Sequence, residues 1–181
     1  MRKTQWAVDP AHSNVQFKIK HLVISSVTGS FRNFNGGASS DAENFEDAEI
    51  HFSVDVSSID TNVEARDAHL RSADFFDAGV FPTITFQSNY FHKVKGDRYN
   101  LSGLLTLKGI TQPVELVAEY GGAARDAEGR LRIGFEVTGS ISRWEFGLNY
   151  GILTESGKFL LGEDVQFTAN IQLVQEVAVA V

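Results

Sequence analysis

"IHFSVDVS", residues 50–57, alternates apolar and polar side chains without a break. Successive side chains of a β-strand point to opposite faces, so this spacing places the apolar groups on one face and the polar groups on the other. The same period of two returns in runs that begin near residues 15, 84, 101, 114, 131 and 165. With a further strand at about residues 27–40, the sequence predicts roughly eight half-buried antiparallel strands.

The connections between these runs are short. Gly, Asn, Asp or Pro occur at 34–37, 95–98, 108–113, 125–130 and 155–158, where the chain is expected to turn. Short connections join neighbouring antiparallel strands, and about eight strands suffice to close a sheet into a small barrel. We therefore predict an all-β fold, an eight-stranded antiparallel up-and-down barrel of the lipocalin-like kind, formed by a single domain over residues 1–181.

Residues 61–81, "TNVEARDAHLRSADFFDAGVF", break the alternation. Thr61 followed by Glu64 matches a capping box, which predicts a short helix that begins near Asn62. Pro82 ends this irregular part before the next strand. The segment is therefore expected to form a helix and a lid that lie across one end of the barrel.

Composition excludes several classes of function. The 181 residues hold 23 acidic and 16 basic side chains, a net charge of -7, which disfavours nucleic acid as a partner. The absence of cysteine removes disulfides, thiolate metal sites and thiol nucleophiles. No run approaches the roughly 18 apolar residues of a membrane span, and no apolar segment of a secretory signal follows the amino-terminal basic residues. We expect a cytoplasmic protein, or a periplasmic one if a signal has been removed.

The inward face carries aromatic bulk together with small residues. The small residues include Gly103 and Gly139, in phase with the inward positions of their strands. Two interpretations remain open: the glycines make room for rings in a filled barrel, which would serve as a stress-response interaction module, or they leave a hollow interior. A hollow interior would suit a long hydrocarbon chain, because about ten CH₂ groups at ~0.8 kcal/mol each give roughly 8 kcal/mol before association costs. The inward aromatic residues are Phe17, Phe52, Phe86, Phe135 and Phe167.

Candidate catalytic groups are weak. Asp9, His12 and Ser13 lie close together, but triad members usually come from distant positions and the chain lacks a G-x-S-x-G motif, so a turn is the simpler interpretation. Asp67 and His69 could form an acid–base pair on an isoprenoid or acyl lipid, which we keep as the enzymatic alternative. The five histidines show no metal-binding spacing. We predict a protein that is not an enzyme and has neither a metal site nor a cofactor other than a bound lipid.

The polar residues expected at the cavity mouth, beside the lipid head group, are Arg66, Asp67, His69, Arg71 and Arg143.

Four stretches of the chain resemble the YceI-like family, whose members look like lipocalins and bind polyisoprenoid or related lipids. They are "WAVDPAHSNVQFKIKHLVISSVTGSF" (6–31), "SSIDTNVEARDAHLRSADFFDAGVFPTITFQS" (57–88), "LSGLLTLKGITQPVEL" (101–116) and "ISRWEFGLNY" (141–150). The second is the most specific, because it joins R-D-x-H-L on a predicted helix to F-F-x-x-x-x-F-P-x-I-x-F.

The resemblance implies an elongated barrel that encloses an apolar tunnel for an isoprenoid tail, such as an isoprenoid quinone precursor or an isoprenoid alcohol. It also suggests a homodimer, and a role in lipid storage, transport or sequestration. It places Phe75, Phe76, Phe81, Ile84 and Phe86 at or behind the tunnel wall and Arg143 near the ligand or the helix. The predicted wall is completed by Ile19, Phe31, Leu105, Ile141, Trp144 and Phe146.

Overall fold

The computed structural model describes residues 3–22, 24–41, 44–151 and 160–177. Eleven strands in these ranges form one antiparallel sheet, accompanied by one α-helix, α1 (Glu64–Arg71), and three 3₁₀ turns, Pro10–His12, Val56–Ser58 and Arg143–Phe146. The strands are β1 (Thr4–Val8), β2 (Asn14–His21), β3 (Ser25–Phe31), β4 (Phe34–Asp41), β5 (Asn44–Asp55), β6 (Ile59–Asp60), β7 (Thr83–Lys95), β8 (Arg98–Leu107), β9 (Ile110–Arg125), β10 (Leu131–Ser142) and β11 (Leu161–Gln175).

The sheet closes on itself with eight strand positions. β1 and β2 pair with successive parts of β11, so the two short strands share one position. β3 and β4 share the next position, because β3 pairs with β2 and β4 pairs with β1. The ring then continues through β5, β7, β8, β9, β10 and β11. This arrangement confirms the predicted eight-stranded up-and-down barrel.

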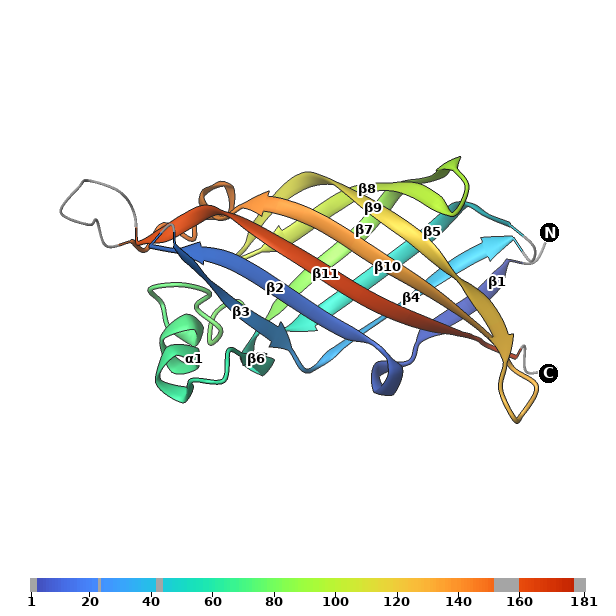
Figure 1. Ribbon diagram of the computed structural model, residues 1–181, viewed down its shortest axis with the longest axis horizontal. Helices are drawn as coiled ribbons and strands as arrows, with labels where there is room; N and C mark the ends of the chain where they lie inside the picture. The colour runs from blue at the N-terminus through green and yellow to red at the C-terminus, as the bar shows by residue number, and fades with distance from the viewer. Residues whose placement is uncertain (1–2, 23, 42–43, 152–159, 178–181) are drawn as a thin grey trace.

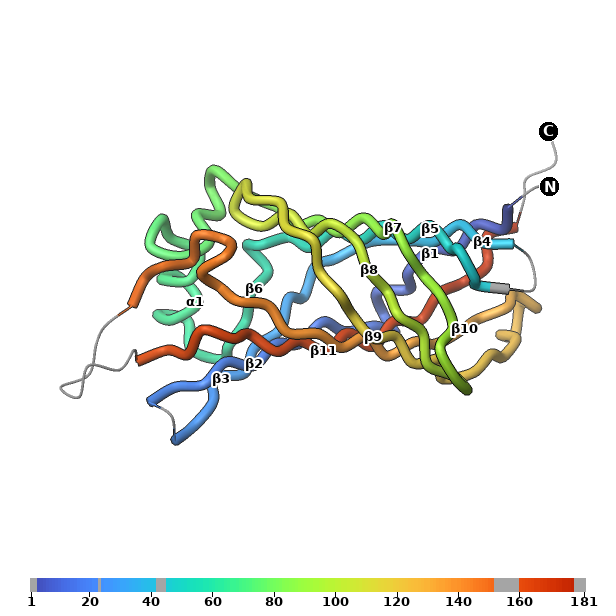
Figure 2. Tube along the Cα trace, turned by 90° about the horizontal axis from the view of Figure 1, so that it is seen from above, coloured from blue at the N-terminus to red at the C-terminus, as the bar shows by residue number. Residues whose placement is uncertain are grey.

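The barrel is long, and its two ends differ (Figure 1). α1 and the β2–β3 turn lie at one end, which we call the α1 end, whereas the start of β1 and the end of β11 lie at the other. The view from above shows the same separation (Figure 2). The helices that the structure describes are too short or too polar to cross a bilayer.

Most of the predicted turns are correct. Lys108 and Gly109 join β8 to β9 with φ angles of 51° and 74°, the left-handed pair that a tight hairpin requires. The prediction of a turn at 34–37 is wrong, because Gly36 and Gly37 lie inside β4 and pair with Phe52 and His51 of β5. The predicted turn at 155–158 lies outside the described residues.

The predicted helix exists, but its predicted cap is wrong. α1 begins at Glu64, and Val63 occupies the cap position without a side-chain hydrogen bond. The hydroxyl of Thr61 donates instead to Asp67 Oδ1, which also accepts from the Thr61 backbone N–H. The carboxylate of Asp67 therefore holds the start of the lid segment from within the helix.

Candidate functional site

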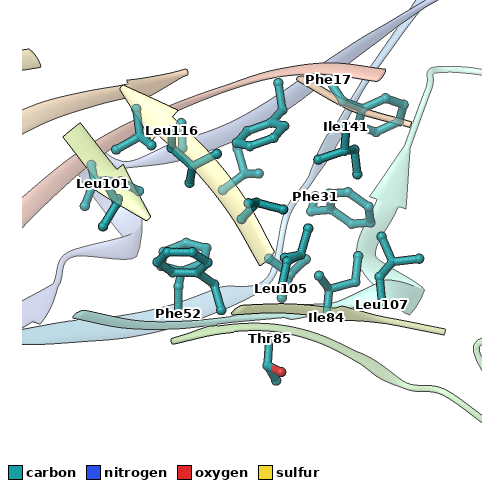
Figure 3. Close-up of a pocket in the computed structure, with 18 of the residues that line it drawn as sticks. Phe17, Phe31, Phe52, Ile84, Thr85, Leu101, Leu105, Leu107, Leu116 and Ile141 are labelled. Atoms are coloured by element: carbon teal, nitrogen blue, oxygen red, sulfur yellow. The ribbon is translucent and has the colours of Figure 1, made fainter. Parts of the chain in front are cut away.

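A cavity of about 270 Å³ runs inside the barrel. It lies between two clusters of buried apolar side chains. One contains Trp6, Phe91, Tyr99 and Phe135. The other, at the α1 end, contains Phe31, Ile59 and Phe146. Apolar side chains from strands all around the ring point into the space between them (Figure 3).

The middle of the barrel is hollow although its wall is aromatic. Inward residues there, such as Phe17, Phe52 and Phe167, keep partial exposure despite facing the axis. A full interior would bury them completely, as it buries Trp6 at the end of the barrel, which is 3% exposed. The interior therefore contains space that the side chains leave unfilled.

Gly103 and Gly139 make room for rings. A Cβ atom on Gly103 would lie 2.7 Å from Phe86 Cζ and 2.3 Å from the Gln87 carbonyl oxygen. A Cβ atom on Gly139 would lie 2.7 Å from Phe167 Cζ. The phenyl rings thus lie flat against the wall at these two glycines, so the cavity volume does not come from the glycines themselves.

Most of the residues predicted for the wall lie on the cavity. The fit is good because the period of two correctly identifies the inward face of a regular strand. Thr85, between two of them, borders the cavity, but its side chain points away from the apolar groups around it (Figure 3). The predicted residues that line the cavity are Phe17, Ile19, Phe31, Phe52, Phe75, Phe76, Ile84, Phe86, Leu105, Phe135, Ile141 and Phe167.

Three predicted wall residues, Phe81, Trp144 and Phe146, do not line the cavity. Regular alternation ends at Ser142, where the chain turns into a 3₁₀ helix. That turn buries Phe146 completely in the cluster at the α1 end and leaves Trp144 38% exposed. Phe81 lies against the β8–β9 turn, with its Cε1 atom 2.7 Å from the position that a Cβ of Gly109 would take.

The sequence interpretation missed several wall residues. Phe45 lines the cavity although it is out of phase with Ile50 and Phe52. Asp47 lies between them with a φ of 59°, and this left-handed residue shifts the alternation. Leu70 and Leu148 also line the cavity, and each lies outside a regular strand, where a period of two carries no information.

Arg143 lines the cavity, but backbone carbonyls occupy its guanidinium. Nε donates to Gly162 O at 2.8 Å, and Nη1 donates to Leu148 O at 2.6 Å and Tyr150 O at 2.8 Å. Burial lowers the pKa of Arg143, although Glu163 acts in the opposite direction. These bonds tie the 3₁₀ turn to β11, so Arg143 stabilises the wall.

The other polar residues predicted for the mouth do not reach the cavity. Asp67 is only 4% exposed, and its carboxylate accepts a hydrogen bond from the Thr61 backbone N–H. Arg66 donates from Nε and Nη2 to the hydroxyl and carbonyl oxygens of Thr61. His69 Nε2 lies 2.8 Å from Asp74 Oδ2, and its ring contacts Phe75 and Tyr150.

Asp67 and His69 therefore have separate partners, and this geometry does not favour the acid–base pair of the enzymatic alternative. Arg71 pairs with the exposed Glu64.

Asp9, His12 and Ser13 form a turn, as the simpler interpretation predicts. His12 Nδ1 lies 2.8 Å from Asp9 Oδ2, but the Ser13 hydroxyl accepts from the Gln172 backbone N–H at 2.9 Å. Arg132 also donates to Asp9, and this bond, with that of His12, lowers the pKa of Asp9 to about 2. In the described part of the chain, no group of three or more His, Asp or Glu side chains is placed to hold a metal ion.

Comparisons with known proteins agree with this architecture. The model of the YceI-like domain family matches residues 6–173. A UPF0312 protein of Staphylococcus aureus is 38% identical over 172 residues, which cover 93% of this chain and 96% of the relative.

Solved structures share the fold. The YCEI protein of Campylobacter jejuni superimposes with a TM-score of 0.77 at 28% identity, over 87% of this chain and 90% of that one. A polyisoprenoid binding domain from Saccharophagus degradans superimposes with a TM-score of 0.68 over 94% of this chain and 98% of that one, and its 17% identity shows the fold alone. Together with the family match over nearly the whole barrel, these similarities show that the chain belongs to the YceI-like family.

Proposed function

We propose that this protein binds a long apolar lipid, a polyisoprenoid, inside the barrel for storage, transport or sequestration. The observation that carries the proposal is the cavity of about 270 Å³ inside the barrel, with an apolar wall. Space of this size accommodates on the order of twenty water-sized groups. A flexible hydrocarbon chain with a similar number of carbon atoms would fill this space and make van der Waals contacts along the whole wall.

The hydrogen-bond partners of Arg143 and Arg66 also indicate whether the buried part of the lipid is charged. The guanidinium of Arg143 donates its hydrogen bonds to backbone carbonyls, and that of Arg66 donates to Thr61. A diphosphate would need cationic partners to offset its desolvation. We therefore propose a lipid whose buried part is uncharged, such as an isoprenoid alcohol or a quinone precursor, with its polar end outside the tunnel.

A binding role is favoured over an enzymatic one. The candidate acid–base groups, Asp67 and His69, have partners of their own and do not line the cavity. The Saccharophagus degradans domain of the same fold is a polyisoprenoid binding domain. Both observations support a carrier that holds its ligand without converting it.

Organic extraction of the purified protein, followed by mass spectrometry, tests the proposal. We expect a long-chain isoprenoid to be released in an amount comparable to that of the protein. Reproducible absence of any long-chain lipid, together with failure to take up an added polyprenol, would contradict the proposal.

A matched pair of variants locates the ligand. Val137 faces the cavity from β10, where its register neighbours are Ala118 and Ala169. Val117 lies one residue from Ala118 on β9 and so points to the outside of the barrel. Val137→Trp should displace about three CH₂-sized groups of ligand, which at ~0.8 kcal/mol each lowers polyprenol affinity roughly fiftyfold. Val117→Trp should leave the affinity unchanged, and equal losses in both variants would place the ligand elsewhere.

A further inference from the structure

The α1 end carries a set of exposed apolar side chains that the tunnel does not use. They come from four separate segments: the β2–β3 turn, the loop before β7, the start of β9, and the 3₁₀ turn with the residues after it. We call them the apolar rim: Leu22, Ile24, Val80, Ile110, Trp144 and Tyr150. Ile24 is 86% exposed and Val80 is 65% exposed, so these two protrude furthest.

Contacts join three of the four segments, the loop before β7, the start of β9 and the 3₁₀ turn with the residues after it. Ile110 Cδ1 lies 3.2 Å from the position that a Cβ of Gly147 would take, which places the start of β9 against the 3₁₀ turn. Phe81, next to Val80, lies against Gly109. The Tyr150 ring packs on Phe75 and His69 at centroid distances of 4.9 Å. The figures show these segments at the same end as α1 (Figures 1 and 2).

The rim segments lie at the same end as the part of the wall that is not held by the sheet. Leu70, Phe75 and Phe76 line the cavity from the lid segment between β6 and β7. Phe75 and Phe76 are held by local backbone bonds, to Ser72 O and Leu70 O. At the opposite end, Phe91 and Tyr99 stack and Phe135 packs edge-on against both. A lipid that enters through the lid therefore disrupts fewer hydrogen bonds between strands than one that enters through the opposite end.

We propose that the apolar rim docks on the surface of a lipid bilayer, so that an isoprenoid chain passes between membrane and tunnel at the α1 end. The inference rests on the proposed lipid-binding function and adds the partner from which the ligand comes. A chain that moves directly between a bilayer and an apolar tunnel avoids exposing its length to water.

The arrangement of the rim fits a bilayer better than a protein partner. A stable protein interface needs a contiguous complementary patch of about 800 Å² on each side, whereas the rim consists of single protruding side chains on separate segments. Such side chains enter a soft interface without a matching surface. Trp144 and Tyr150 are the residue types that favour the membrane–water boundary. With a net charge of -7, the protein should prefer zwitterionic over anionic lipids.

Flotation of the full chain with phosphatidylcholine vesicles tests the proposal. The wild-type protein should float with the vesicles, and phosphatidylglycerol should reduce the floating fraction. Ile24→Asp and Val80→Asp should each lower the floating fraction at least about fivefold, because a carboxylate resists insertion. The control is Val94→Asp, which changes a 56% exposed valine on β7 outside the rim and should have no effect.

Brominated phosphatidylcholine provides a second measurement. Bromine should quench the fluorescence of Trp144 but not that of Trp6, which is 3% exposed in the cluster at the opposite end. Trp144→Phe should remove the quenching. Absence of quenching in the wild type, or an equal loss of flotation in Val94→Asp, would overturn the docking proposal.

The outcomes separate docking from lipid binding. A protein that releases isoprenoid on extraction but does not float overturns docking alone. A protein that floats but never carries lipid supports docking and overturns the proposed function. If Ile24→Asp instead converts a dimer into a monomer, with no vesicle binding in the wild type, the rim is an interface between copies of this chain and docking is overturned.

Discussion

The two ends of the barrel are closed in different ways. At the end that holds β1 and the last residues of β11, Trp6, Phe91 and Phe135 pack across the axis. Outside them, Arg132 donates to both Asp9 and Asp126. At the α1 end, a helix and a loop lie across the barrel, and the segments there carry the exposed apolar side chains of the rim.

The different closures predict that the two ends open at different free energies. The backbone of a strand is held by hydrogen bonds to the strands on both sides, so an end closed by strand side chains opens only at a high free energy. A segment outside the sheet is held by side-chain packing and local bonds, and it opens at a lower free energy. The comparison predicts that equal substitutions at the two ends have unequal effects.

The largest expected effect on stability comes from removing one phenylalanine ring at each end and comparing the two losses. Phe135→Ala removes a ring that contacts Phe45, Phe91, Tyr99 and Tyr120, and should cost about 3–5 kcal/mol, a fall in Tm of roughly 10 °C or more. Phe76→Ala, in the lid segment, removes a half-buried ring packed edge-on against Phe31 and should cost about 1 kcal/mol.

Calorimetry measures the two Tm values, and stopped-flow transfer of a fluorescent isoprenoid measures access to the tunnel. We expect faster exchange in Phe76→Ala despite its small loss of stability. Equal losses of stability in the two variants would remove the distinction between the ends.

The second effect concerns the bond that anchors the lid. Asp67→Ala leaves the buried Thr61 N–H without its acceptor and should cost about 1–3 kcal/mol, or roughly 3–9 °C in Tm. His69→Ala, four-tenths exposed on the same helix, is the control and should change stability by less than about 0.5 kcal/mol. Thermal denaturation measures both. A larger loss in His69→Ala would mean that the ring contacts with Tyr150 hold the lid in place of Asp67.

The smallest expected effect concerns stability as a function of pH, and it arises from Asp9 at the end opposite α1. The bonds from Arg132 and His12 lower the pKa of Asp9 from 3.8 to about 2, so the folded state binds this proton less readily than the unfolded chain does. The stabilisation is therefore complete above about pH 5 and is lost as the pH falls from 4 towards 2. Asp9→Asn should flatten that part of the stability profile and lower stability at neutral pH.

Urea denaturation between pH 2 and 7 measures this slope. Asp164→Asn, at an exposed position of β11, is the control and should leave the slope unchanged. An unchanged slope in Asp9→Asn would show that the bond to Arg132 does not contribute to stability.

Much of the fold could be predicted because the sheet is regular. In the runs around Phe17, Phe52 and Phe167, alternation alone identified the face that lines the cavity. β1 was not predicted, because its five residues are too few to establish a period, and it exists through pairing with β4 and β11. The capping box at Thr61 failed because α1 begins only at Glu64, and the Thr61 hydroxyl donates to Asp67 Oδ1 and accepts from Arg66 Nε in place of a backbone N–H of the first turn.

Within the regular strands, the amino-acid sequence alone was enough to identify the inward residues, since the alternation of side chains is a property of a single extended strand. The tertiary structure decided how much space those residues leave. Whether rings from opposite walls meet depends on the closure of eight strand positions and on bends such as that at Asp47, which combine residues far apart in the chain. It also decided that Arg143 serves the wall and that Trp144 faces outward, because both follow from the 3₁₀ turn that replaces the strand after Ser142.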